Sequence, residues 1–284
     1  MASALTLKKR GVRLRGMNFL KALMLAAGRV IRRISPKFSK RLEPVYPFVH
    51  QKAGVFAVLK TKSPNVALVS SAGLYLEGQE PFNYKSFYGD ASFRVFPSEF
   101  PLPSLRLTVS DFDRSGFEAD PACLFPLPEL KAVLSETGGQ AAAHHFSLLG
   151  FCLKPKKLLE TTVPKIVKLL REDETDLVFL VPACVVCHEV LPQVAQELES
   201  AGISTVTFAF IPKALETVRA SRTILFGGDC GLPFGKAAQE TRKQLLRMAV
   251  RAAYEMKAAG EAWQFPSAVP IGTQFNDDRP LPVR

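Results

Sequence analysis

Two cysteines three residues apart carry the strongest chemical signal in the sequence. Cys184 and Cys187 follow the apolar run at residues 178–181 closely, and a helix is expected to begin within the next few residues. A thiolate at such a junction is stabilised by the positive end of the helix dipole, and a second thiol can resolve an oxidised or substrate-bound sulfur. The spacing therefore predicts Cys184 as the nucleophile and Cys187 as the resolving thiol.

Three other interpretations of this pair stay open. A structural zinc site needs two more ligands, and because no second Cys-x-x-Cys pair is present, only His144, His145 or Cys230 could supply them. The pattern Cys-x-x-Cys-His also matches covalent haem attachment, which requires export. The third interpretation is inert packing of two small thiols under a helix. We expect no bound metal and no tightly bound cofactor.

Several ionisable side chains could support thiol chemistry. His188 follows Cys187 directly, and an imidazolium there would lower a thiol pKa. Asp111 and Asp113 would share one face of an extended segment, where their repulsion would raise the pKa of one of them; two solvated loop acids are the alternative. His145 precedes a predicted strand and is either a catalytic group or an ordinary core or surface histidine.

The order of apolar runs predicts an α/β fold. Strands and helices alternate with short connections, which is typical of parallel βαβ units. We expect an αβα sandwich with a mainly parallel sheet, and consider a division into two similar lobes near residues 135–160. The predicted strands are residues 65–71, 92–97, 105–110, 142–148, 177–181, 205–210 and 223–226, and the predicted helices are residues 128–137, 163–171, 192–201, 212–219 and 236–257.

The net charge of +11 is concentrated at the N-terminus. Of the 37 Lys and Arg residues, residues 1–42 hold 12 and no acidic residue, which leaves 25 basic against 26 acidic residues elsewhere. A nucleic-acid-binding surface is therefore not expected. We assign residues 1–45 to a basic extension and residues 46–284 to the α/β domain. Residues 17–33 have the pattern of an amphipathic basic helix, which either packs on the core or contacts an anionic membrane surface peripherally.

The cysteine content and the hydropathy pattern indicate the compartment. Five cysteines are an odd number, spread thinly over a chain too long to need disulfide staples, which favours a reducing cytoplasm. No uninterrupted run of about 18 apolar residues occurs, so no transmembrane helix is predicted.

A series of short motifs runs through roughly residues 60–250. The motifs are Val66-Ala67-Leu68-Val69 through Gly73, Glu80-Pro81-Phe82-Asn83, Gly89-Asp90-Ala91-Ser92-Phe93-Arg94, His145-Phe146-Ser147-Leu148-Leu149-Gly150-Phe151, Val181-Pro182-Ala183-Cys184-Val185-Val186-Cys187-His188, Gly202-Ile203-Ser204-Thr205-Val206, and Gly231-Leu232-Pro233-Phe234-Gly235-Lys236 with Gln239. In this order they resemble the selenoprotein B-like proteins of glycine, sarcosine, betaine and D-proline reductases.

The resemblance implies a specific chemistry. In those reductases the selenium of a Sec-x-x-Cys motif attacks a carbon beside an activated amine and a C–N bond is cleaved reductively, and Cys184 stands where that selenium would be. It further implies a second subunit carrying a pyruvoyl group and a thiol or thioredoxin-type electron donor. Arg94 could pair with a substrate carboxylate or form an ordinary salt bridge, and Asp90 and Ser92 of the same motif are further substrate-binding candidates.

The chain also departs from that family. It has Thr108-Val109-Ser110-Asp111 where the relatives read Thr-His-Ser-Asp, and Asp120-Pro121-Ala122 where they read Asp-x-Asn. The missing histidine and amide favour an altered substrate or a lost activity. Besides a thiol-dependent reductase acting on a small amino- or carboxyl-bearing substrate, two alternatives therefore stand. One is a catalytically silent binding or regulatory protein docked through residues 17–33, and the other is a metal-binding protein using the Cys-x-x-Cys-His segment.

Overall fold

The structure is a computed structural model that describes most of the chain after residue 54. The described residues are 55–86, 88–108, 114–152, 155–184, 186–211, 219–228, 231, 234, 239–266 and, for the backbone only, 281–282. The predicted N-terminal extension with its amphipathic segment lies outside the described residues. So do Asp111, Asp113, Cys230 and nearly all of the predicted helix at residues 212–219.

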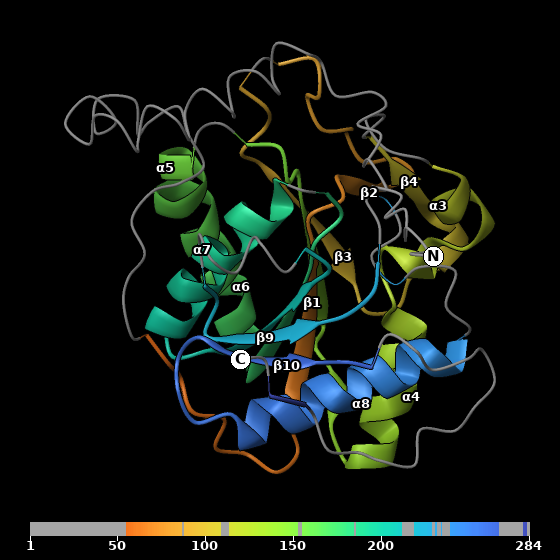
Figure 1. The fold of residues 1–284 in the computed structure, drawn as a ribbon. Coiled ribbons are helices and arrows are strands. Elements are labelled where there is room, and N and C mark those ends of the chain that lie inside the picture. Colours follow the sequence, from red (N-terminus) through yellow and green to blue (C-terminus); the bar gives the residue numbers. More distant parts are fainter. Residues whose placement is uncertain are drawn as a thin grey trace, which may run out of the picture.

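A mainly parallel sheet forms the centre of the molecule (Figure 1). In the described part of the chain it has nine strands in the order β11-β10-β9-β8-β7-β1-β6-β3, with β5 also paired to β1. Neighbouring strands from β10 through β9, β8, β7 and β1 to β6 run parallel. Strands β3 and β11 pair antiparallel at the two edges. The bounds are β1 Asn65–Ser70, β3 Phe93–Pro97, β5 Gln140–Ala141, β6 His144–Leu148, β7 Leu177–Val181, β8 Ser204–Ala209, β9 Arg222–Leu225, β10 Glu261–Gln264 and β11 Leu281–Pro282.

Helices cover both faces of this sheet, which confirms the predicted α/β fold class. One face carries α4 and α8, and the other carries α6 and α7 (Figure 1). A separate antiparallel pair is formed by β2 (Leu74–Leu76) and β4 (Leu105–Leu107). The helices are α3 Ser115–Ala119, α4 Leu127–Thr137, α5 Pro155–Lys157, α6 Val163–Glu172, α7 Cys187–Ser200 and α8 Gln239–Glu255, with shorter turns η2 Leu102–Ser104, η3 Pro121–Cys123 and η4 Leu158–Thr162.

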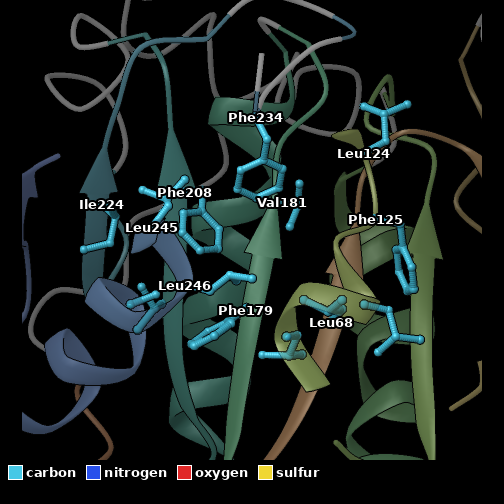
Figure 2. Close-up of a cluster of buried hydrophobic side chains, with 14 of the residues drawn as sticks. Leu68, Leu124, Phe125, Phe179, Val181, Phe208, Ile224, Phe234, Leu245 and Leu246 are labelled. Atoms are coloured by element: carbon cyan, nitrogen blue, oxygen red, sulfur yellow. The ribbon is translucent and has the colours of Figure 1, made fainter. Parts of the chain in front are cut away.

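The central strands are apolar on both faces because both faces are covered. Alternate residues of β1 enter different cores: Val66 and Leu68 belong to the core under α4 and α8, and Ala67 and Val69 belong to the core under α6 and α7. Figure 2 shows the first of these cores, where aromatic and aliphatic side chains of the strands meet the leucines of α8. The near-continuous apolar runs in the sequence are explained by this double burial.

The start of α7 differs from the sequence prediction. The sequence predicted a helix at residues 192–201. The helix instead begins at Cys187, five residues earlier, and contains Pro192. The backbone N–H groups of Glu189 and Val190 both donate to the Val186 carbonyl oxygen, at 3.0 and 3.2 Å, and so close a first turn before the proline. Cys187 therefore lies in the helix rather than in the loop before it.

Other differences concern short strands and the last helix. Strands β2, β5, β10 and β11 were not predicted, and the last predicted helix is observed at Gln239–Glu255, beginning beside residues outside the described part. The lobe boundary considered near residues 135–160 stays a prediction, although strands on both sides of it pair within one sheet. Among the described residues, no helix has the length and apolar composition needed to cross a membrane.

The strand order reverses between β1 and β7. From β1 the chain passes to β6 on one side, and then returns to β7 on the other side of β1 before continuing to β8. The loops that follow β1 and β7 therefore diverge at the carboxyl edge. In open α/β sheets such a reversal is the usual place for a ligand site.

Candidate active site

Three strand ends meet at this reversal. Ser71 follows β1, Gly150 lies just after β6, and Cys184 follows β7 by three residues. The backbone joins them directly, because the Ser71 N–H donates to the Val181 carbonyl oxygen at 3.0 Å and the Gly150 N–H donates to the Ser71 carbonyl oxygen at 2.9 Å. The sequence prediction that the cysteines follow a parallel strand at its carboxyl end is thus met by the structure.

The two sulfur atoms lie in contact. Cys184 Sγ and Cys187 Sγ are 2.7 Å apart, and the Cys184 backbone N–H donates to Cys187 Sγ at 3.1 Å. Cys187 is fully buried at the first position of α7, whereas Cys184 is half-buried. The pair can form a disulfide with small side-chain movements, since the required separation of the sulfurs is about 2.05 Å.

The environment of Cys187 favours its thiolate. Burial by itself raises the pKa of this thiol, but the hydrogen bond from the Cys184 N–H and the nearby polar groups of Cys184, Ser71 and Ala183 outweigh burial and lower the pKa. The N-terminus of α7 acts in the same direction. Sequence reasoning assigned this helix-end stabilisation to Cys184, and the structure places it at Cys187 because α7 begins there.

His188 forms hydrogen bonds to the backbone of the site. Its Nε2 accepts a hydrogen bond from the Phe210 backbone N–H at 3.1 Å, so the proton of the neutral ring is on Nδ1, which donates to the Cys184 carbonyl oxygen at 2.8 Å. The ring is buried and packs edge-on against the Phe210 ring, with centroids 4.3 Å apart. His188 therefore connects the loop between β7 and α7, here called the cysteine loop, to the end of β8.

His145 lies within β6 and away from the cysteine loop. Its Nδ1 accepts a hydrogen bond from the Leu68 backbone N–H at 3.0 Å, and the ring packs edge-on against Phe125. Burial, with further contributions from Lys131 and His144, lowers the pKa of His145 to about 3, so the ring is neutral at physiological pH. These contacts fit the core role that the sequence left open, and they do not bring His145 to the sulfurs.

The three predicted substrate-binding residues form one hydrogen-bonded loop. The Arg94 guanidinium donates to the carbonyl oxygens of Glu80 and Pro81, at 2.6 and 3.1 Å, and to Ser92 Oγ at 3.0 Å. The Asp90 carboxylate accepts from the backbone N–H groups of Asn83 and Ser92, each at 2.8 Å. The structure thus brings Arg94, Asp90 and Ser92 together, with these polar groups directed at their own loop.

That loop is attached beside the cysteines through Gly89. Gly89 forms an antiparallel bridge with Cys152, two residues beyond Gly150. Its φ is +74°, and a Cβ there would overlap the Phe151 carbonyl oxygen, so a glycine is required. This contact explains why the motif at residues 89–94 begins with a glycine.

Asp90 should make the stability of the protein depend on pH. Burial raises its pKa, but hydrogen bonds from Asn83 and Ser92 and the charge of Arg94 prevail, so the pKa is lowered from 3.8. A carboxyl group with a lowered folded-state pKa contributes stability above its unfolded pKa and loses it as the pH falls through the folded value. We expect Asp90→Ala to cost about 1 kcal/mol at pH 7, because the group is partly exposed. Urea unfolding at pH 7 and below pH 3 checks this, and a cost that does not shrink in acid would contradict it.

The other cysteines have different surroundings. Cys123 and Cys152 are buried. Burial, together with the charge of Asp120, raises the pKa of Cys123 to about 12, so its thiolate is scarce at neutral pH. Among the described residues, no group of three or more His, Cys, Asp or Glu side chains is arranged to hold a metal ion.

Sequence reasoning missed the parts played by Ser71 and Gly150. The Ser71 hydroxyl donates to the Val181 carbonyl oxygen and accepts from the Ala183 backbone N–H, both at 3.2 Å. A Cβ on Gly150 would overlap Cys187 Sγ. Ser71 directly follows β1 and Gly150 follows the apolar pair Leu148-Leu149, and a position just after a strand is the signal that could have identified them.

Comparisons with known proteins place the chain near one reductase subunit. No family model matches the chain, and no solved structure matches it. It is 27% identical over 210 residues to D-proline reductase subunit gamma of Acetoanaerobium sticklandii, a match that covers 72% of this chain and 84% of that protein. The matched relative is one subunit of a larger reductase. The chain is thus a distant relative of the reductase family to which that subunit belongs.

Proposed function

We propose that this protein is a thiol-dependent oxidoreductase that uses Cys184 and Cys187 for two-electron reductive cleavage of a C–N bond in a small amino- or carboxyl-bearing substrate. The observation that carries the proposal is the contact between a half-buried and a fully buried sulfur, 2.7 Å apart, at the reversal of the strand order. The relationship to a D-proline reductase subunit supports the reaction class.

The reaction balances as a two-electron exchange. The Cys184 thiolate attacks the carbon that bears the amine, so a C–S bond forms and the C–N bond breaks, and the nitrogen leaves with the electron pair and takes a proton. The Cys187 thiolate then attacks Cys184 Sγ, so an S–S bond forms and the C–S bond breaks, and the carbon keeps the electron pair and takes a proton. The dithiol is oxidised to a disulfide while the substrate is reduced.

The burial of the two sulfurs supports this division of roles. Cys184 has the more exposed side chain, so a substrate can reach it, whereas Cys187 meets only its protein neighbours. The interactions that lower the pKa of Cys187 keep it ready as a thiolate for the second step.

Regeneration of the dithiol needs a reductant, for which we propose a thiol or thioredoxin-type donor. A second subunit would activate the substrate amine, in keeping with the subunit designation of the relative. The carboxyl edge that carries the cysteines is where such a subunit and its substrate would meet.

Single turnover without a donor tests this function. The reduced protein, copurified with any associated subunit, is mixed with D-proline, glycine, sarcosine or betaine, and thiols and products are counted together. We expect one substrate to be cleaved with the loss of two thiols per C–N bond, because the pair supplies both electrons. Products formed without thiol loss, or no cleavage of any of the four with the thiols intact, would count against the proposal.

A further inference from the structure

The sulfur of Cys187 is held by two residues that lie far from it in the sequence. We propose that Gly150 and Ser71 are positioning residues that form a seat for Cys187 Sγ and hold it against Cys184 Sγ. The seat is made by the ends of β1 and β6, and the cysteine loop after β7 closes over it. This inference rests on the proposed function, to which it adds two residues outside the Cys-x-x-Cys segment.

Gly150 supplies the space for the sulfur. Its φ lies outside the left-handed region, so the backbone conformation itself does not demand a glycine. A Cβ at this position would instead overlap Cys187 Sγ and lie 2.9 Å from the Ser71 carbonyl oxygen. Cys187 has a short side chain anchored in the first turn of α7, so its sulfur can move only by leaving the seat.

Ser71 supplies the polar side of the seat. Its carbonyl oxygen accepts the Gly150 N–H at 2.9 Å and lies 3.9 Å from Cys187 Sγ. Its hydroxyl bridges the Val181 carbonyl oxygen and the Ala183 N–H, and so fixes the start of the cysteine loop. The Ser71 side chain is also among the groups that lower the pKa of Cys187. One residue therefore aligns the loop and favours the thiolate.

A double-variant cycle tests the contact without any assumption about chemistry. Gly150→Ala is made in the full chain and again with Cys187→Ala, which removes the overlapping sulfur. We expect the loss in melting temperature to be at least about twice as large when Cys187 is present. Gly139→Ala is the matched control, because its Cβ would lie 2.8 Å from the Pro64 carbonyl oxygen, far from the cysteines, and its effect should be equal in both backgrounds. Equal losses for Gly150→Ala, including failure of both to fold, would overturn the seat.

A resolving-rate measurement tests the positioning role. An aromatic disulfide reagent first forms a mixed disulfide on Cys184, and attack by Cys187 then releases a second aromatic thiolate in a first-order step. We expect Ser71→Ala and Gly150→Ala to slow this second step by about tenfold or more and to move its pH midpoint upward, with Gly139→Ala unchanged. Rates and midpoints equal to those of the wild type would overturn the positioning role. If the wild type releases no second thiolate, the proposed function fails, and the melting-temperature cycle still decides whether the seat exists.

Discussion

Cys184→Ser is expected to abolish reductive turnover, by at least about a thousandfold, whereas Cys187→Ser should stop the protein after the first half of the reaction. The serine at position 184 is a poor nucleophile, so no C–S bond forms. With Cys187 replaced, the attacking sulfur remains but nothing displaces the product from it, and a covalent adduct accumulates on Cys184. Intact-mass measurement after incubation with substrate separates the two variants.

Cys123→Ser is the control for this pair. Its pKa of about 12 and its burial keep Cys123 from acting as a nucleophile, so this variant should retain turnover and form no adduct. Equal loss of turnover in all three variants would indicate a general effect on folding. Retained turnover in Cys184→Ser would exclude Cys184 as the attacking group.

Arg222→Met is expected to destabilise the fold by about 3–5 kcal/mol, because it leaves an unpaired carboxylate in the core. Arg222 and Glu199 form a fully buried ion pair at 2.8 Å at the amino ends of β8 and β9. Glu199 also accepts from the Thr205 backbone N–H and hydroxyl, both at 2.8 Å, and from the Ala57 N–H. Burial raises the pKa of Glu199 and lowers that of Arg222, so each charge depends on the other.

Arg106→Met is the matched control for the buried pair. Arg106 pairs with Glu77 at the same distance, 2.8 Å, but the two side chains are 43% and 71% exposed, so the loss should stay below about 1 kcal/mol. Chemical unfolding of both variants gives the comparison. In folded Arg222→Met the reactivity of Cys184 should be unchanged, since the ion pair lies at the opposite edge of the sheet. Equal losses of unfolding free energy in the two variants would contradict the claim that burial makes the Arg222–Glu199 pair more important than the exposed pair.

Local sequence signals predicted several strands well. The bounds of β7 were predicted to the residue, and those of β1 and β3 to within one residue at either end, because each is a short apolar run flanked by residues that end a strand. The start of α7 was missed because a proline usually interrupts a helix interior, yet Pro192 lies inside this helix. Whether a helix contains an internal proline depends on its tertiary contacts. Here the helix begins before the proline, so Cys187 occupies its first position.

The parts of the site that could not be predicted depend on strand order. Nothing local indicates that Ser71 and Gly150 meet Cys187, since β1 must pair with both β6 and β7 to bring them together. Likewise, the partner of Glu199 is fixed only by the pairing of β8 with β9. The chemical types at the site were visible in the sequence, and their contacts follow from the topology.

Redox titration of the reduced full-length protein in graded glutathione buffers, with peptide mapping by mass spectrometry, tests the central claim most directly. The short sulfur contact and the stabilised thiolate of Cys187 predict a reversible disulfide between Cys184 and Cys187, formed while Cys123 and Cys152 stay reduced. If Cys184 and Cys187 both remain thiols across the titration, or Cys184 keeps a glutathione that Cys187 never displaces, the two cysteines are not a redox pair.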